Sequence, residues 1–195
     1  EVAGRLGERL RIPPGMHVDG TWGTFGATTA AASMLNLSSE QALIALRAAA
    51  CQVPWSMYLP VAEGATARNL YVAEAVARGL RITQSVAAGV TAPSGALDAF
   101  DAKVLGGVGA EGILAPPDEW LLPQGYLKPY AAVRHVHYAA AAALRWHEAS
   151  PANTAQILTM RVQTYREAIT YCGNRAPRTA IQAQFSISFG VAAAL

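Results

Sequence analysis

The sequence predicts a mainly α protein, in which an all-helical domain is followed by the start of a smaller α+β domain. Alanine-rich runs with apolar residues at helical spacing fill most of the first 90 residues and return over 131–148. A stretch rich in proline and glycine, 92–129, separates these two regions. A single segment, 157–165, alternates apolar and polar residues with the period of two that is typical of a half-buried strand.

The first helix is predicted over 24–36, within the run HVDGTWGTFGATTAAA at 17–32. Its residues are mostly Gly, Ala and Thr, and side chains this small let a neighbouring backbone approach closely. His17 and Asp19 lie just before the helix, where the first backbone N–H groups have no partner inside it. A polar pair in this place can face a ligand, so the run is a candidate pocket.

Three further helical patterns follow before residue 90. Residues 38–41, Ser-Ser-Glu-Gln, have the form of a capping box, which predicts a helix over 39–52. The next pattern covers 66–78, and we expect Gly79 to form its C-terminal cap. A weaker pattern over 80–89 contains β-branched residues. The first part of the chain therefore reads as consecutive helices.

The second half changes character at the proline-rich stretch. Its five prolines make a long helix unfavourable over 92–129, which indicates a linker. Beyond it, 131–148 is strongly helical, and 181–195 reads as a helix still in progress at the last residue. We therefore expect residues 1–126 to be part of a helical domain and 127–195 to be part of an α+β domain whose end can return toward the first.

Composition limits the class of protein. Hydrophobic residues make up 52% of the 195 and charged residues only 14%, which predicts apolar surface that a partner or further segments would cover. No uninterrupted apolar run reaches the roughly 18 residues of a membrane span. The net charge of +2 comes without a Lys/Arg cluster, so neither a membrane nor nucleic acid is an expected partner. Cys51 and Cys172 lack C-x-x-C spacing, and we expect two buried thiols in a soluble, cytoplasmic protein.

Motifs for other chemistries lack their structural context. The G-x-G-x-x-G pattern at 107–112 is neither preceded by a strand nor followed by a helix, so a mobile glycine loop is favoured over a dinucleotide site. His135 and His137, two residues apart on a helix, would point about 200° from each other and would not share a metal ion. No serine lies in G-x-S-x-G. We therefore expect no metal and no organic cofactor.

Five short motifs occur in order along nearly the whole chain. They are the run from His17 with its Ala-rich helix, 37–42 (LSSEQA), 63–68 (EGATAR), 127–130 (LKPY) with Arg134 and His137, and 184–188 (QFSIS). Together they resemble the MmgE/PrpD family, which contains 2-methylcitrate dehydratases, cis-aconitate decarboxylases and iminodisuccinate epimerases. The resemblance implies a large helical domain with a smaller α+β domain inserted into it, and a homodimer.

His17 is the strongest candidate for catalysis. It precedes a helix N-terminus, which favours an anion, and an imidazole with an ordinary pKa near ~6.5 can gain or lose a proton at working pH. The resemblance places the family's active-site histidine at this position. A histidine that merely caps the turn is the alternative. Asp19 either orients His17 or caps the helix, and we favour capping. Asp19 and Thr21 join the expected substrate-binding residues.

Four more residues complete the candidate site. Arg68 can hold a carboxylate with two parallel hydrogen bonds, although the family often has lysine here, so a possible proton donor is lost. By resemblance, Lys128 matches an active-site lysine and Tyr171 falls near an active-site tyrosine, so both are candidate catalytic residues. His137 matches a recurrent position near the domain junction. It is either a substrate-binding residue or an interior histidine bonded to backbone.

Together these residues suit a small di- or tricarboxylate that gains or loses a proton next to a carboxylate. Dehydration, decarboxylation and epimerisation all remain open. An alternative is an incomplete or non-catalytic module that binds a small acid, because the family also draws acid–base residues from a segment that would precede Glu1. A third is a structural helical interaction protein, in which His17, Arg68 and Lys128 would be scattered.

Overall fold

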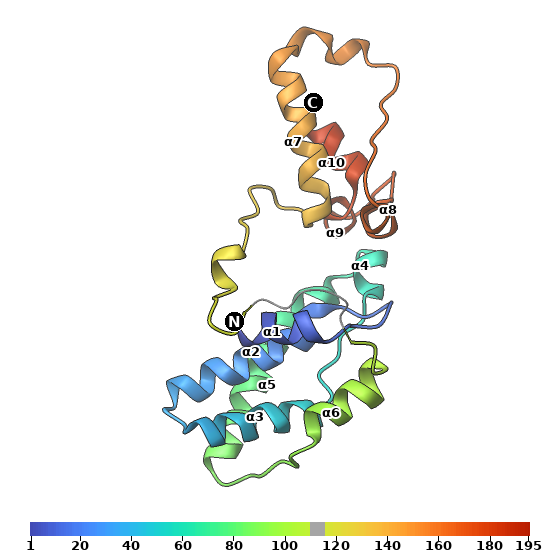
Figure 1. Cartoon of the computed structure of the whole chain (residues 1–195). Helices are drawn as coiled ribbons and strands as arrows, with labels where there is room; N and C mark the ends of the chain where they lie inside the picture. Colours follow the sequence, from blue (N-terminus) through green and yellow to red (C-terminus); the bar gives the residue numbers. More distant parts are fainter. Residues whose placement is uncertain (110–115) are drawn as a thin grey trace. The chain divides into compact units, whose positions relative to one another are not determined.

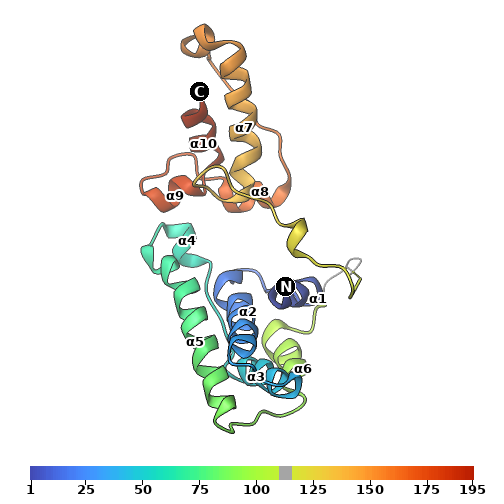
Figure 2. The same cartoon turned by 90° about the vertical axis from the view of Figure 1, so that its left-hand side faces the viewer.

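The computed structural model of the chain describes residues 1–109 and 116–195 and is mainly α-helical, as predicted. It forms two compact units (Figures 1 and 2). Unit 1 contains Glu1–Leu59 and Ala67–Gly125, and unit 2 contains Pro60–Thr66 and Tyr126–Leu195. Each unit has its own hydrophobic core, and each is described by itself below.

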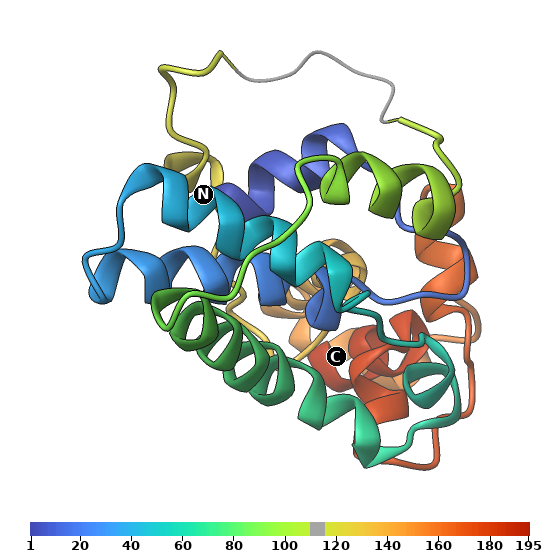
Figure 3. The ribbon, with the colours of Figure 1, turned by 90° about the horizontal axis from the view of Figure 1, so that it is seen from below.

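Unit 1 is a group of helices packed around α2, which contacts α1, α3 and α5 (Figure 3). Its core includes Phe25, Ile82, Phe100 and Leu105. The helices are α1 (Val2–Arg9), α2 (Val18–Met34), α3 (Ser39–Cys51), α5 (Leu70–Ala87) and α6 (Ala96–Phe100), with the shorter turns η1 (Thr66–Asn69), η2 (Asp101–Leu105) and η3 (Leu122–Gln124).

The close packing of α2 against α5 depends on small residues, as the sequence predicts. A Cβ atom added at Gly79 would lie 2.7 Å from the backbone nitrogen of Thr28 and 2.7 Å from Cβ of Ala27. One turn further along α5, the Thr83 hydroxyl donates to the Thr28 carbonyl at 3.1 Å. The expectation that Gly79 caps a helix is therefore wrong. Residues 66–78 and 80–89 do not form separate helices, because Gly79 lies inside α5 at its contact with α2.

Three other local expectations in unit 1 can be compared with the structure. The capping box at Ser38 and Gln41 is confirmed, since both of its hydrogen bonds form. Cys51, expected to be buried, is exposed. The stretch 92–129 is not only a linker, because α6 and η2 within it contribute Phe100 and Leu105 to the core. The glycine pattern at 107–112 lies mostly outside the described residues.

Unit 2 is built on the packing of α7 (Arg134–Ala149) against α10 (Ile187–Ala194). Its core includes Val136, Ala140, Ala168 and Val191. Gly190 on α10 lies so close to Val136 that a side chain there would collide with it. The remaining elements are η4 (Pro151–Gln156), α8 (Arg166–Cys172), α9 (Ala180–Gln184) and α4 (Leu59–Glu63), whose last carbonyl accepts a hydrogen bond from the Gln182 amide.

The strand predicted over 157–165 does not form, and this segment has no regular structure. A strand needs a neighbouring extended chain to pair its backbone N–H and C=O groups. Where the structure describes the chain, extended residues pair only as isolated bridges. Leu158 is 99% exposed, so the alternating pattern buries no apolar face in this unit.

The helix predicted over 181–195 is also interrupted. It forms as α9 and α10, separated at Phe185 and Ser186. The Ser186 hydroxyl caps α10 by accepting the backbone N–H of Phe189 at 3.1 Å, and it donates to the Asn174 carbonyl. Within the described parts of the chain, no helix has the length and apolar character needed to cross a membrane.

Candidate functional site

His17 lies at the start of α2, where its backbone is extended and its side chain caps the helix. Its Nδ1 atom accepts the backbone N–H of Asp19 at 3.2 Å. The backbone of His17 is held by Ser56, whose carbonyl accepts the His17 N–H at 2.8 Å and whose hydroxyl donates to the His17 carbonyl at 2.9 Å. The Ser56 hydroxyl oxygen also accepts the Gly20 N–H at 3.2 Å. Ser56 is buried, and its two hydrogen bonds to the His17 backbone fix the position of the histidine.

Asp19 and Arg68 complete a cluster with His17. An Asp19 carboxylate oxygen, Oδ2, lies 3.7 Å from Nδ1 of His17 and 3.6 Å from Nη2 of Arg68. The three side chains are 12%, 26% and 32% exposed for His17, Asp19 and Arg68, so the cluster is half-buried. The expectation that Asp19 caps α2 is wrong, because His17 itself is the cap and Asp19 lies in the first turn.

Two tyrosines flank the imidazole of His17. The Tyr58 ring lies 6.1 Å from it, centroid to centroid, and nearly parallel at 12°, and the Tyr71 ring lies 5.8 Å away at 51°. The Tyr71 hydroxyl donates to the Met57 carbonyl at 2.8 Å. Neither tyrosine is among the residues predicted from the sequence. For Tyr71 a signal existed, since it follows Arg68 by three residues and that spacing places two side chains on one helical face.

The surroundings of His17 disfavour its charged form. Burial lowers the pKa of His17 below its usual value of 6.5; the Asp19 carboxylate opposes this shift, and the Arg68 guanidinium adds to it. The expectation of an ordinary pKa is thus corrected. The neutral form of the ring is therefore favoured over the charged form.

Thr21 supports the backbone at the start of α2. Its side chain is buried, and its hydroxyl lies 3.4 Å from the His17 carbonyl, to which it donates. The next threonines along the same face repeat this pattern, because Thr24 donates to Gly20 and Thr28 donates to Thr24, both at 2.8 Å. Each hydroxyl donates a hydrogen bond to a backbone carbonyl four residues earlier, so a polar side chain can lie in an apolar interface.

The other candidate residues belong to unit 2. Lys128 is exposed in the segment before α7. Tyr171, on α8, is half-exposed, and its ring stacks on His135 at 6.2 Å and 19°. His137 donates from Nε2 to the Ala132 carbonyl at 3.1 Å, which is the geometry of an interior histidine bonded to backbone.

His135 in unit 2 has polar and aromatic neighbours that no sequence pattern indicates. Its Nδ1 lies 2.5 Å from the Tyr165 hydroxyl, and its ring packs against both Tyr165 and Tyr171. Burial lowers the pKa of His135, and the neighbouring Arg134 lowers it further, while Glu167 raises it. His135 and His137 have different partners. Across the described residues, no three His, Cys, Asp or Glu side chains gather in the manner of a metal site.

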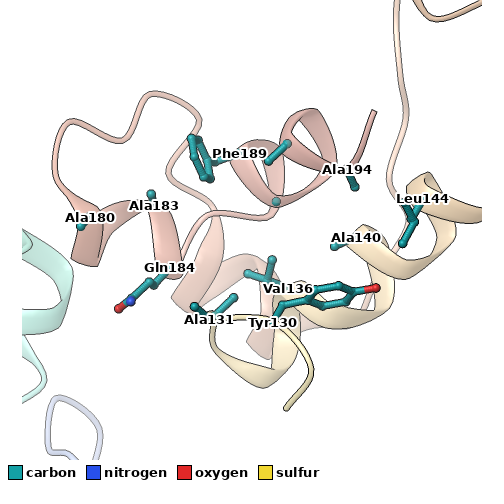
Figure 4. A pocket seen from close by; sticks show the side chains of 13 residues that line it. Tyr130, Ala131, Val136, Ala140, Leu144, Ala180, Ala183, Gln184, Phe189 and Ala194 are labelled. Carbon is teal, nitrogen blue, oxygen red and sulfur yellow. The ribbon is translucent and has the colours of Figure 1, made fainter. Parts of the chain in front are cut away.

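A separate cavity of about 530 Å³ lies in unit 2 between α7 and the α9–α10 segment (Figure 4). The lining is apolar except for the Tyr130 and Gln184 side chains, and its described residues include no Asp, Glu, His, Lys or Arg. Its lining residues include Val136, Ala140, Leu144, Ala183, Phe189 and Ala194.

The His17 cluster is thus the polar site that the structure assembles from predicted residues. It gathers His17, Asp19 and Arg68 at the start of α2 and in η1. Of the three residues that a structural protein would scatter, His17 and Arg68 meet in this cluster, whereas Lys128 belongs to unit 2.

Comparison with known families gives two matches. The model of the MmgE/PrpD N-terminal domain matches residues 1–105, and that of the MmgE/PrpD C-terminal domain matches residues 130–195. No curated protein matches the chain by sequence.

Proposed function

Because the chain belongs to the MmgE/PrpD family, whose domains indicate a function of the dehydratase or isomerase type, we propose that it acts on a small di- or tricarboxylate. The reaction is a proton transfer next to a carboxylate, which ends in dehydration, decarboxylation or epimerisation and uses no organic cofactor. The observation that supports this is the cluster of His17, Asp19 and Arg68 at the N-terminus of α2.

In this proposal Arg68 binds a substrate carboxylate. Its planar guanidinium presents N–H donors in a fork that matches the two oxygens of a carboxylate, and Nη2 already lies 3.6 Å from a carboxylate oxygen of Asp19. The α2 N-terminus adds its partial positive charge on the same side as His17. An anionic group here meets a cation, the positive end of a helix and the His17 ring. These groups also stabilise the negative charge that develops when a carbon next to a carboxylate loses a proton.

Lys128, Tyr171 and His137 remain proposed contributors from unit 2. Lys128 supplies a second cation for a polycarboxylate, and Tyr171, whose ring stacks on that of His135, supplies a hydroxyl. We assign Thr21 to positioning, since its hydroxyl is engaged with the His17 carbonyl. A homodimer in the cytoplasm is part of the proposal, supported by exposed apolar side chains such as Leu127, which is 95% exposed.

The test is an NMR assay in heavy water with cis-aconitate, 2-methylcitrate and iminodisuccinate, following deuterium uptake and new products. We expect exchange or turnover with one of them, reduced at least ~100-fold in Arg68→Ala, because this removes a charged hydrogen-bonding group from the site. Arg81→Ala is the matched control, since Arg81 is an exposed arginine on α5 outside the cluster. Equal rates in the two variants would refute the assignment of Arg68.

A second candidate is a module that binds a small acid without converting it. The exposure of large apolar side chains, including Leu127 and Leu158, favours it, because such surface is typical of a chain that a partner covers. Calorimetric titration with the same three acids separates the two functions. Binding that Arg68→Ala weakens, without any deuterium uptake, would support the binding module and contradict the enzyme.

A further inference from the structure

The two ring nitrogens of His17 are not equivalent in this structure. Nδ1 lies 3.2 Å from the backbone nitrogen of Asp19 and accepts its hydrogen. A backbone N–H is a donor at every accessible pH, so the nitrogen that accepts from it carries no proton. In a neutral imidazole the single proton then lies on Nε2.

A competing partner for Nδ1 is the Asp19 carboxylate. In the arrangement of a catalytic Asp–His pair, this carboxylate would accept a hydrogen bond from a protonated Nδ1, and Nε2 would be left unprotonated as a base. Its Oδ2 atom lies 3.7 Å from Nδ1, however, longer than the 3.2 Å to the backbone nitrogen, and the same oxygen faces Nη2 of Arg68 at 3.6 Å. The geometry favours the backbone N–H as the partner of Nδ1.

The ring is also held in this orientation. Both backbone groups of His17 are bonded to Ser56, and the ring is in contact range of the Tyr58 and Tyr71 rings. To act as a base at Nε2, His17 would need its proton on Nδ1, where it would point at the Asp19 N–H. The cap of α2 would be lost, and a donor would face a donor.

Resting on the function proposed above, we propose that His17 serves the site as a neutral hydrogen-bond donor. Its Nε2–H binds an anionic oxygen of the substrate, either a carboxylate or the oxygen that gains charge during the reaction. The Asp19 backbone N–H is the positioning group that keeps the proton on Nε2. No proton is transferred at His17, and it is not the base.

The burial of the ring and the neighbouring charges act in the same direction. The charged and titratable groups that face the ring are Asp19 on α2, Arg68 on η1, and Tyr58 and Tyr71. Burial and Arg68 lower the pKa of His17, and Asp19 opposes them without reversing the direction. A neutral ring is what a donor at Nε2 with an unprotonated Nδ1 requires.

The direct test is ¹⁵N NMR of the histidine ring nitrogens in the full chain, with the His17 signals assigned by their loss in His17→Gln. We expect a protonated Nε2 and an unprotonated Nδ1 at pH 7, and a titration midpoint below 6.5. A proton on Nδ1, or a midpoint at or above 6.5, would overturn the proposal. This measurement does not require turnover. If the chain shows no activity with the three acids, the NMR result still tests which ring nitrogen of His17 carries the proton.

Two variants test the donor role by activity or by acid binding. Gln places an amide N–H near the position of Nε2, whereas Asn keeps an acceptor for the cap and lacks the donor further out. We expect His17→Gln to retain at least tenfold more activity or affinity than His17→Asn, and the cap to make the Asn variant the more stable in thermal unfolding. An Asn variant as active as the Gln variant contradicts a donor at Nε2.

Discussion

Replacing Gly79 by alanine tests the contact that places α5 beside α2. The new Cβ would meet the Thr28 nitrogen at 2.7 Å and the Ala27 carbonyl carbon at 2.9 Å, and both are backbone atoms that cannot rotate away. Overpacking of this kind costs about 1–3 kcal/mol. Loss of the 3.1 Å hydrogen bond from Thr83 to Thr28 adds about 1 kcal/mol. The higher helix propensity of alanine offsets about 1 kcal/mol of this loss of stability.

The net expectation for Gly79→Ala is a loss of about 1–3 kcal/mol of the free energy of unfolding of unit 1. For a protein of this size that corresponds to a melting temperature lower by roughly 2–4 °C per kcal/mol, measured by circular dichroism. Gly95→Ala is the matched control, since nothing lies within 4 Å of its added Cβ. If Gly79→Ala is as stable as the parent chain or more stable, helix propensity outweighs the contact and the steric argument is refuted.

Three further outcomes are expected. Ser56→Ala removes the donor to the His17 carbonyl, so we expect the free energy of unfolding in urea to fall by about 1–3 kcal/mol and acid binding to weaken. An unchanged urea midpoint would mean that this hydrogen bond does not hold His17 in place. Because folding lowers the pKa of His17, the unfolded chain binds more protons than the folded chain below pH 6.5, so the free energy of unfolding decreases as the pH falls from about 6.5. His17→Asn should remove this part of the pH dependence, and an unchanged pH dependence in the variant would contradict the lowered pKa. Burial raises the pKa of the Cys172 thiol to about 11, so we expect a thiol reagent at pH 8 to modify the exposed Cys51 alone. Rapid reaction of two thiols would show instead that Cys172 is accessible.

The helices of this chain were predictable where short-range signals determine them. The capping box at Ser38 acts over three residues, and its prediction is confirmed. The prediction failed at Gly79 and at 157–165, because a glycine inside a helix and an alternating segment have a structure only in relation to a distant neighbour. Gly79 had α2 as that neighbour, whereas 157–165 had no extended partner in the described residues.

The candidate site divides in the same way. His17 and Asp19 could be named from one short run, since a polar pair before a helix is a local feature. Which of the two caps the helix was predicted incorrectly, because the choice depends on the backbone conformation of His17, held by Ser56 some 40 residues later in the chain. Tyr58 was missed for the same reason, since no local pattern brings it to the imidazole.

The sequence by itself determined that the chain is mainly helical and where most of its helices lie, and it named His17 and Arg68 as candidate residues of an acid-binding site. Only the tertiary structure decided that Asp19 lies close to both, that two tyrosine rings lie near the imidazole, and which ring nitrogen accepts the Asp19 N–H. Helix periodicity and capping depend on residues within about four positions, so they can be read along the chain. The state of a proton depends on burial and on partners that only the folded chain brings together.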